Sequence, residues 1–292
     1  MELLDGKALS NKIYQNIKST IFTLPFTPKL GIIIVGNRPD SLVYVNMKRK
    51  KCLEIGIDVE VFYFEDPKKT EVLKKIKDLN KDKEFNGVMV QLPLPENLKP
   101  NTQEILDIIN PSKDVDGLTT ISLGKLISYG RLDLSKLDKL DFFISSTVYG
   151  VLKFIYNYRI DILGKNIGII GNSALLGMPL SIILSNMGGT VEICHIDTDC
   201  LKNHTMGKDI IISCCGVKGL IKGDMIKDDV VIIDIGINVE MIDGKKKIFG
   251  DCEWQSCSTK ASKMTPVPGG VGPMTICSLL EQTVKSKITD LK

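Results

Sequence analysis

The 292-residue chain has little of what nucleic-acid-binding, membrane-spanning or secreted proteins have in abundance. Its net charge is only +3, and its lysines are dispersed with few aromatic residues between them, so nucleic-acid binding gains little support. No apolar run approaches the roughly 20 residues of a transmembrane helix, and the first residues lack the pattern of a signal peptide. We therefore expect a cytoplasmic protein, with an organelle as the alternative.

Metal-binding motifs are missing as well. The chain contains eight cysteines and only two histidines, His195 and His204, and no two cysteines have the C-x-x-C spacing of a zinc knuckle. The cysteines lie mostly in apolar or helical patterns. We expect reduced, buried thiols and no metal site.

What the chain does have is a series of short β-branched runs that alternate with helical patterns, which is typical of an α/β fold. Helices are predicted from about residue 41 and over residues 70–79, and strands over residues 30–35, 59–64, 87–92, 166–170, 190–194, 209–213 and 230–235. Uninterrupted apolar strands suit a parallel sheet covered on both faces. A less regular stretch ends near Asp141, where we place the boundary between two domains.

The first of these helices carries a lysine within its apolar stripe. At 100° per residue, the residues that share an arc of about 100° are Ser41, Tyr44, Val45, Lys48, Cys52 and Ile55. Lys48 is either a lysine at the edge of the core whose ammonium group reaches water, or a partly desolvated amine. In the second case its pKa is lowered and it exchanges protons near neutral pH.

A second candidate site is a strand, a glycine-containing turn and a helix in series over residues 167–180. Gly171 and Gly177 lie in the turn, and Pro179 suits a first helical turn. Backbone amides at such a helix start can bind the pyrophosphate of a dinucleotide. Because the spacing is not G-x-G-x-x-G, an ordinary βα turn is the alternative.

Two further features indicate a site for a planar ligand rich in hydrogen-bonding groups. Gln91 ends an apolar strand, where open α/β sheets bind ligands, and Asp116 lies in the turn-like segment Lys113–Gly117; capping of a turn is the alternative for both. Residues 265–275 are rich in proline and glycine. This composition predicts a rigid loop whose amides can approach a flat or charged ligand closely.

Five sequence blocks together resemble the methylenetetrahydrofolate dehydrogenase/cyclohydrolase (FolD) family. They span nearly the whole chain, in the order Gly36–Lys48, Val90–Pro95, Lys113–Gly117, Asp234–Asn238 and Thr265–Thr275. The resemblance implies two α/β domains that flank a cleft. The first is a folate-binding catalytic domain over residues 1–141, to which a helix over residues 272–292 returns, and the second is a Rossmann-type NAD(P)-binding domain over residues 142–271. It also implies a homodimer that pairs through the cofactor domains.

The resemblance implies roles for individual residues. Members oxidise 5,10-methylenetetrahydrofolate with a nicotinamide cofactor and then hydrolyse the methenyl product to 10-formyltetrahydrofolate. Lys48 would be the acid/base and polarising group of the hydrolytic step, and Gln91 would hydrogen-bond it and help keep it neutral. Tyr44 would stack on the folate and Asp116 would hold the pterin ring. Further implied contacts are Pro268, Gly269 and Gly272 to the folate, and Gly171, Asn172, Ser173, Gly177, Ile196 and Ile237 to the dinucleotide.

Three places depart from the family pattern. Ser145–Tyr149 replaces a Pro-Cys-Thr-Pro-like turn, Asn172 stands where many members have arginine, and Ile196 replaces a serine and precedes Asp197. An arginine can hold the 2′-phosphate of NADP, whereas a carboxylate repels it, so we expect NADP with NAD as the alternative.

The changed Ser145–Tyr149 turn makes a dehydrogenase-only member the main competing function. A non-catalytic folate-binding relative is a second candidate. A Rossmann dehydrogenase that acts on an amino or keto acid is a third.

Overall fold

The computed structural model describes residues 1–289, with side chains through Ser286, and divides into two compact units. The Lys48 unit comprises Lys12–Leu126, Asp138–Ser146 and the chain from Ile276 onward. The Gly171 unit comprises Met1–Asn11, Ile127–Leu137 and Thr147–Thr275. The units are thus built from interleaved segments, whereas the expected ranges 1–141 and 142–271 are consecutive. Residues 290–292 of the expected C-terminal helix lie outside the described part.

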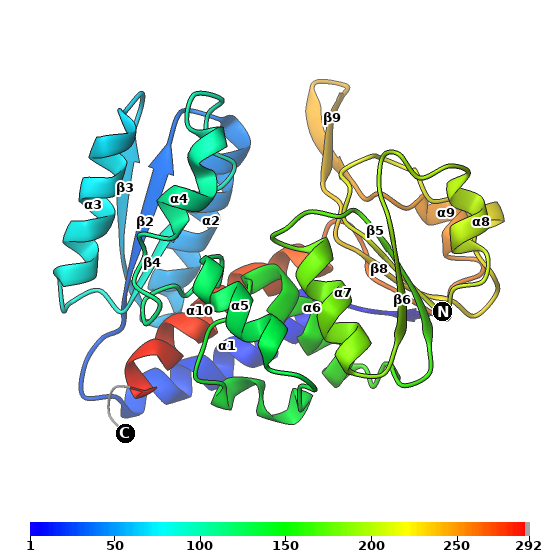
Figure 1. Cartoon of the computed structure of the whole chain (residues 1–292), viewed down its shortest axis with the longest axis horizontal. Coiled ribbons are helices and arrows are strands. Elements are labelled where there is room, and N and C mark those ends of the chain that lie inside the picture. Colours follow the sequence, from blue (N-terminus) through cyan, green and yellow to red (C-terminus); the bar gives the residue numbers. More distant parts are fainter. Residues whose placement is uncertain (290–292) are drawn as a thin grey trace. The chain divides into compact units, whose positions relative to one another are not determined.

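A parallel three-stranded sheet forms the centre of the Lys48 unit. Its order is β3 (Asp58–Phe64), β2 (Lys29–Val35) and β4 (Gly87–Val90). Residues 30–35 of the middle strand are all buried, as expected for a parallel strand covered on both faces. Helices α2 (Pro39–Ile55) and α3 (Lys69–Lys81) pack against this sheet (Figure 1).

The other helices that lie wholly or partly in the Lys48 unit are α1 (Gly6–Thr23), the 3-10 helix η1 (Lys99–Asn101), α4 (Thr102–Leu106), α5 (Thr120–Ser128), the 3-10 helix η2 (Leu134–Lys139) and α10 (Val271–Thr289). The stretch expected to be irregular after Gly117 therefore contains a two-turn helix. The strand predicted over residues 87–92 ends earlier, at Val90. Gln91 still donates its N–H to Ile33 O at 2.8 Å, but Pro93 has no N–H to continue the ladder.

The Gly171 unit contains a six-stranded sheet in the order β1–β11–β8–β7–β5–β6. Its strands are β1 (Glu2–Leu3), β5 (Asn166–Ile170), β6 (Thr190–Cys194), β7 (Ile210–Ser213), β8 (Val231–Asp234) and β11 (Lys263–Met264), and all neighbouring pairs are parallel. Its helices are α6 (Ser146–Asn157), α7 (Gly177–Asn186), α8 (Leu201–Thr205), the 3-10 helix η3 (Gly223–Met225) and α9 (Trp254–Cys257). The strand order reverses at β5, which has β6 on one side and β7 on the other. This is the switch point at which open α/β sheets bind ligands.

Two parts of the Gly171 unit were not predicted. The strands β1 and β11 have only two residues each, too few for a periodic pattern. The hairpin of β9 (Asn238–Ile242) and β10 (Lys245–Phe249) projects from the rest of its unit (Figure 1). Its available signal was the Asp243-Gly244 dipeptide, both residues of which have positive φ, as the tight turn of a hairpin requires.

Within the described residues, no helix combines the length and the apolarity needed to cross a bilayer. All eight cysteines are free thiols, and most of them are buried, although Cys200 is exposed.

Candidate active site

Lys48 projects from α2 into the interior of its unit. The buried residues of this helix are Ser41, Val45, Lys48, Cys52 and Ile55, as the periodicity predicted, and Tyr44 is half-buried. The helix begins at Pro39 and ends at Gly56, whose φ of +90° suits a glycine C-cap. Lys48 is only 6% exposed, so the alternative in which its ammonium group reaches water is wrong.

The Lys48 amine has defined partners at the end of β4. Its Nζ donates to Gln91 Oε1 at 2.9 Å and lies 3.6 Å from Met89 Sδ. Gln91 Nε2 in turn donates to the carbonyl oxygen of Leu92 at 2.7 Å, which fixes the amide with its oxygen toward the lysine. Two residues more than 40 positions apart are thereby joined at the carboxyl edge of the sheet.

Burial shifts the pKa of Lys48. Desolvation lowers it from the ordinary 10.5, while the charge of Asp116 acts in the opposite direction. A lysine in this environment is neutral over more of the pH range than one in water. Gln91 Oε1 accepts a hydrogen bond from either protonation state, so burial, and not Gln91, is what favours the neutral amine. Gln91 orients it.

Asp116 lies in a turn held by a neighbouring carboxylate. Asp114 is buried and accepts hydrogen bonds from Leu118 N at 3.1 Å, Thr119 N at 2.9 Å and Ser122 Oγ at 2.6 Å. Gly117 has a φ of +65°, and a Cβ there would lie 2.3 Å from the carbonyl carbon of Ile144. These contacts hold the turn in a conformation that leaves Asp116 half-buried with its charge acting on Lys48.

Tyr44 lies one helical turn before Lys48 on the same face of α2. Burial raises the pKa of its hydroxyl, and the charge of Asp40 adds to the effect. The ring is thus neutral and partly exposed, as a surface for stacking requires.

The residues predicted to bind a dinucleotide lie at the carboxyl edge of the sheet in the Gly171 unit. Gly171 has a φ of +123°, and a Cβ on Gly177 would lie 1.9 Å from Gly171 O, so only glycine permits this tight turn between β5 and α7. No side chain caps the N-terminus of α7, while Asn172 and Ser173 are exposed beside it. Ser173 O accepts hydrogen bonds from Leu176 N at 3.2 Å and Met178 N at 3.1 Å. A helix start without a side-chain cap, behind a glycine turn, fits a pyrophosphate.

Two more of the predicted dinucleotide contacts are exposed in the same unit. Ile196 follows β6 and is 97% exposed, and Ile237 follows β8 and is 42% exposed. Asp197 is also exposed, and its carboxylate lies 3.5 Å from His195 Nδ1.

The proline-glycine segment forms a compact loop of the Gly171 unit before α10. Gly269 has a φ of +112° and accepts a hydrogen bond from Lys7 N at 3.0 Å. A Cβ on Gly270 would lie 2.6 Å from Pro266 O. Pro268 is exposed, and Gly269 and Gly272 are half-buried. The dependence of this backbone on glycine is as expected, and the rigidity of the loop stays a prediction.

Two family models match the chain. The catalytic domain of tetrahydrofolate dehydrogenase/cyclohydrolase matches residues 4–116, and the NAD(P)-binding domain of the same enzymes matches residues 145–290. The chain belongs to the tetrahydrofolate dehydrogenase/cyclohydrolase family. The predicted family, the α/β fold and the presence of an NAD(P)-binding domain are thereby confirmed.

Similar proteins extend over the full length of the chain. The bifunctional protein FolD of Sulfurihydrogenibium sp. is 43% identical over 291 residues, which cover 98% of this chain and 97% of that protein. The crystal structure of the bifunctional FolD enzyme of Campylobacter jejuni has a TM-score of 0.90 at 41% identity and covers 99% of both chains. The Trypanosoma brucei enzyme, solved with NADP and an inhibitor, has a TM-score of 0.92 at 26% identity and covers 99% of this chain and 98% of its own. This chain is accordingly a bifunctional methylenetetrahydrofolate dehydrogenase/cyclohydrolase of the FolD family.

Several buried polar residues around these sites were not predicted from the sequence of this FolD-family enzyme. Gln282 of α10 is 1% exposed and donates to Val115 O at 2.9 Å and Ile144 O at 2.8 Å, while its Oε1 accepts from Ile144 N at 2.9 Å. It thus fixes the residue that precedes Asp116. The motif Lys113–Gly117 itself contained the signal for Asp114, whereas nothing in the local sequence distinguishes Gln282.

A pair of buried carboxylates, Asp234 and Asp251, was missed in the Gly171 unit. Burial raises the pKa of Asp234 to about 6, although the backbone N–H groups of Gly236, Asp251 and Cys252 donate to it. Position 236 in the Asp234–Asn238 block requires glycine, because a Cβ on Gly236 would lie 2.0 Å from Asp251 Oδ1. Within residues 1–289, no three His, Cys, Asp or Glu side chains gather as a metal site would require.

Proposed function

We propose that Lys48 is the group that carries the cyclohydrolase step of this enzyme in one-carbon metabolism. The observation that supports this role is a buried amine of lowered pKa, hydrogen-bonded to Gln91 at 2.9 Å. Hydrolysis of 5,10-methenyltetrahydrofolate adds water to a cationic carbon, opens one C–N bond and releases one proton. A neutral amine beside that carbon can accept the proton and pass it on, which is the work of a general base.

The residues around Lys48 would bind and orient the folate. Tyr44 offers a ring face for stacking, and Asp116 offers a carboxylate for the hydrogen-bond donors of the pterin ring. Pro268, Gly269 and Gly272 stay predicted folate contacts on the strength of the resemblance.

The dehydrogenase step needs positioning more than acid/base chemistry. The nicotinamide of the dinucleotide supplies the hydride acceptor. The turn of Gly171, Asn172, Ser173 and Gly177 would hold the pyrophosphate, and Ile196 and Ile237 would offer apolar contacts to the flat parts of the cofactor. Fixing the two reactants in line provides most of what hydride transfer requires.

For the cofactor we propose NADP, with a preference over NAD weakened by Asn172 and Asp197. Asn172 gives the 2′-phosphate no positive charge, and the exposed carboxylate of Asp197 repels it. Comparison of kcat/KM for the two cofactors tests this. A ratio above roughly 100 in favour of NADP, about 2.7 kcal/mol, would reject the weakened preference.

A spectrophotometric assay tests both activities at once. The enzyme is supplied with 5,10-methylenetetrahydrofolate and either NADP or NAD, and the reduced cofactor and the decay of the methenyl product are followed together. We expect reduction of the cofactor and accelerated methenyl decay. Reduction of the cofactor without accelerated methenyl decay would contradict the cyclohydrolase step, and no reaction with either cofactor would contradict the dehydrogenase step as well.

We further propose a cytoplasmic homodimer paired through the Gly171 units. The resemblance supports the dimer, and the composition of the chain favours the cytoplasm. Light scattering coupled to size-exclusion chromatography tests the dimer, and a mass of one chain would contradict it.

A further inference from the structure

A fully buried carboxylate lies beneath the loop that follows β7 in the Gly171 unit. Asp251 is 0% exposed and lies outside the strands of the sheet. Its two oxygens accept hydrogen bonds from Ser213 Oγ at 3.0 Å, Cys215 N at 2.9 Å, Cys215 Sγ at 3.4 Å, Gly216 N at 3.2 Å, Val217 N at 2.9 Å and Asn238 Nδ2 at 3.0 Å. A buried carboxylate with six donors is well compensated for its desolvation.

Three of these donors are the successive backbone amides of residues 215–217. Successive amides that converge on one anion form a nest of the kind that binds phosphates in other proteins. Here the protein's own carboxylate fills the nest. These amides are therefore committed to Asp251, and the start of α7 behind the Gly171 turn is left as the place for the pyrophosphate.

The same carboxylate also fixes the segment that follows β8. Asn238 donates to its Oδ1, and Gly236 approaches that oxygen so closely that a Cβ would lie 2.0 Å away. Ile237, a predicted cofactor contact, lies between these two residues. Because β8, β7 and β5 are neighbours in the sheet, Asp251 joins the carboxyl ends of two strands beside the switch point.

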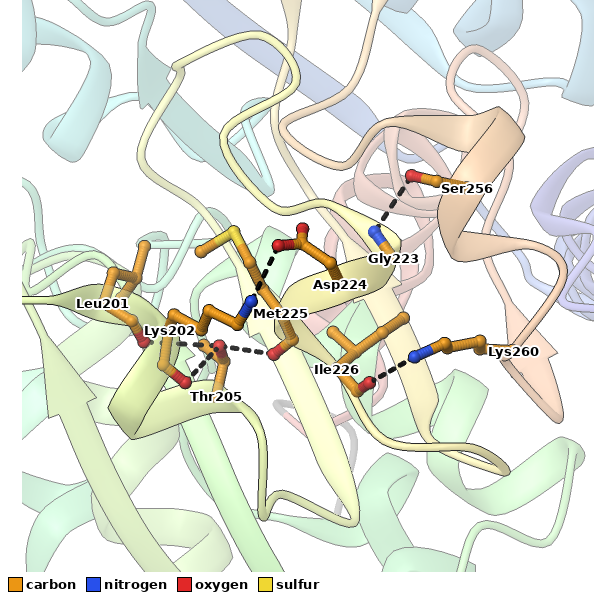
Figure 2. A network of polar contacts seen from close by, with 9 residues as sticks. All are labelled: Leu201, Lys202, Thr205, Gly223, Asp224, Met225, Ile226, Ser256 and Lys260. Carbon is orange, nitrogen blue, oxygen red and sulfur yellow. Dashed lines mark hydrogen bonds and ion pairs between the residues drawn. The ribbon is translucent and has the colours of Figure 1, made fainter.

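The far end of the loop after β7 is held by an independent network (Figure 2). Thr205 Oγ1 donates to Met225 O at 2.7 Å, Ser256 Oγ accepts from Gly223 N at 2.9 Å, and Lys260 Nζ donates to Ile226 O at 3.2 Å. Lys202 and Asp224 add an ion pair. The middle of the loop is held by backbone hydrogen bonds from Gly219 N to Gly250 O at 3.3 Å and from Ile221 N to Asp251 O at 3.1 Å. Residues 215–217, at the sheet edge, are held by the Asp251 side chain.

We propose that Asp251 is a positioning residue for the dinucleotide. Its carboxylate holds the amides of residues 215–217 and the side chain of Asn238. It thereby keeps the segments after β7 and β8 in the position in which they contact the cofactor. This inference rests on dinucleotide binding at that edge of the sheet.

The test is a split between cofactor and folate parameters in the full-length enzyme. In Asp251→Asn, one of the acceptor oxygens becomes an NH₂ group that faces N–H donors, so the loop shifts. We expect KM for the preferred dinucleotide to rise at least tenfold, with KM for 5,10-methylenetetrahydrofolate and the cyclohydrolase rate within twofold of wild type. The matched control, Asp228→Asn at an exposed position of the same unit, should leave all three unchanged.

Ser213→Ala provides a milder second variant in case Asp251→Asn does not fold. It removes one donor to the carboxylate, and we expect KM for the dinucleotide to rise about two- to fivefold with an unchanged cyclohydrolase rate. An unchanged dinucleotide KM in both folded variants, or a parallel loss of both activities in Ser213→Ala, would overturn the proposal. A wild-type enzyme that reduces neither cofactor would instead overturn the dehydrogenase function, and this inference with it.

Discussion

Replacing Lys48 by methionine separates the energetic cost of the buried amine from its chemistry. The variant keeps an unbranched side chain in the buried stripe of α2 and removes a group that is 6% exposed. We expect Lys48→Met to abolish cyclohydrolase activity while dehydrogenase activity stays measurable, because only the hydrolytic step requires the amine.

The same substitution should stabilise the enzyme at pH 7. Burial lowers the pKa of Lys48 from 10.5, so folding at pH 7 either removes its proton or holds a charge out of water. Removing the proton costs at most about 4.8 kcal/mol, from about 1.36 kcal/mol per pH unit between pH 7 and 10.5, and this value bounds the penalty. Loss of the hydrogen bond to Gln91 offsets about 1 kcal/mol. We therefore expect a gain of at most about 4 kcal/mol, which at about 2 cal/mol/K of unfolding entropy per residue corresponds to at most about 6 °C in Tm.

The gain should depend on pH in a predictable direction. Between the lowered pKa of folded Lys48 and 10.5, the unfolded chain binds a proton that the folded chain does not. Wild-type stability therefore rises with pH in this window, by up to about 1.4 kcal/mol per unit. Methionine does not titrate, so the difference between variant and wild type should shrink as the pH approaches 10.5.

Equilibrium unfolding in urea, followed by circular dichroism at pH 7, 8 and 9, measures the effect. Lys50→Met is the matched control, because Lys50 is an exposed residue of the same helix, and it should change the free energy of unfolding by less than about 0.5 kcal/mol. A Lys48→Met variant less stable than wild type at pH 7, or a gain that does not vary with pH, would refute the reasoning. Equal loss of both activities in a folded variant that still binds folate would refute the catalytic role.

Three further outcomes are expected. Gly236→Ala should destabilise the enzyme by about 1–3 kcal/mol in thermal unfolding, because its Cβ would lie 2.0 Å from Asp251 Oδ1; an unchanged Tm would contradict this. Gln282→Leu should lower the free energy of unfolding by about 2–4 kcal/mol, since three buried backbone groups lose their partner, and should raise KM for folate through Asp116, whereas a KM within twofold of wild type would argue against that link. The ratio of cyclohydrolase to dehydrogenase rate should fall as the pH is lowered through the pKa of Lys48, because a protonated amine cannot act as a base; a ratio that stays constant over the whole pH range in which the enzyme is folded and active would exclude this.

The central strands and the key lysine could be predicted because their signals are local. Residues 32–34 and 210–212 are continuous isoleucine runs that the fold buries on both faces, and a 3.6-residue period placed Lys48 among the buried residues of α2. The Gly171 turn was recognisable because a residue with a side chain cannot occupy it.

The supporting polar residues could not be predicted for a physical reason. Gln282 and Asp251 are polar side chains whose burial is compensated by backbone groups of distant segments, and no window of sequence contains both partners. Asp114 differs, since its partners lie within eight positions, and an Asx-type turn in Lys113–Gly117 would have indicated it. The two-residue strands β1 and β11 were missed because their pairing depends on segments from opposite ends of the chain.

The hydrogen bonds of Gln282 also bear on when this protein can fold. They span 167 positions to Val115 and 138 positions to Ile144, and β11 pairs with the second and third residues of the chain. Such long-range contacts slow folding, because a large loop must close before any of them forms. On the ribosome, the turn that carries Asp116 stays without the hydrogen bonds of Gln282 until residue 282 has emerged. The Lys48 unit therefore cannot complete its folding before then, nor the Gly171 unit before residues 263 and 264 are available to pair with β1.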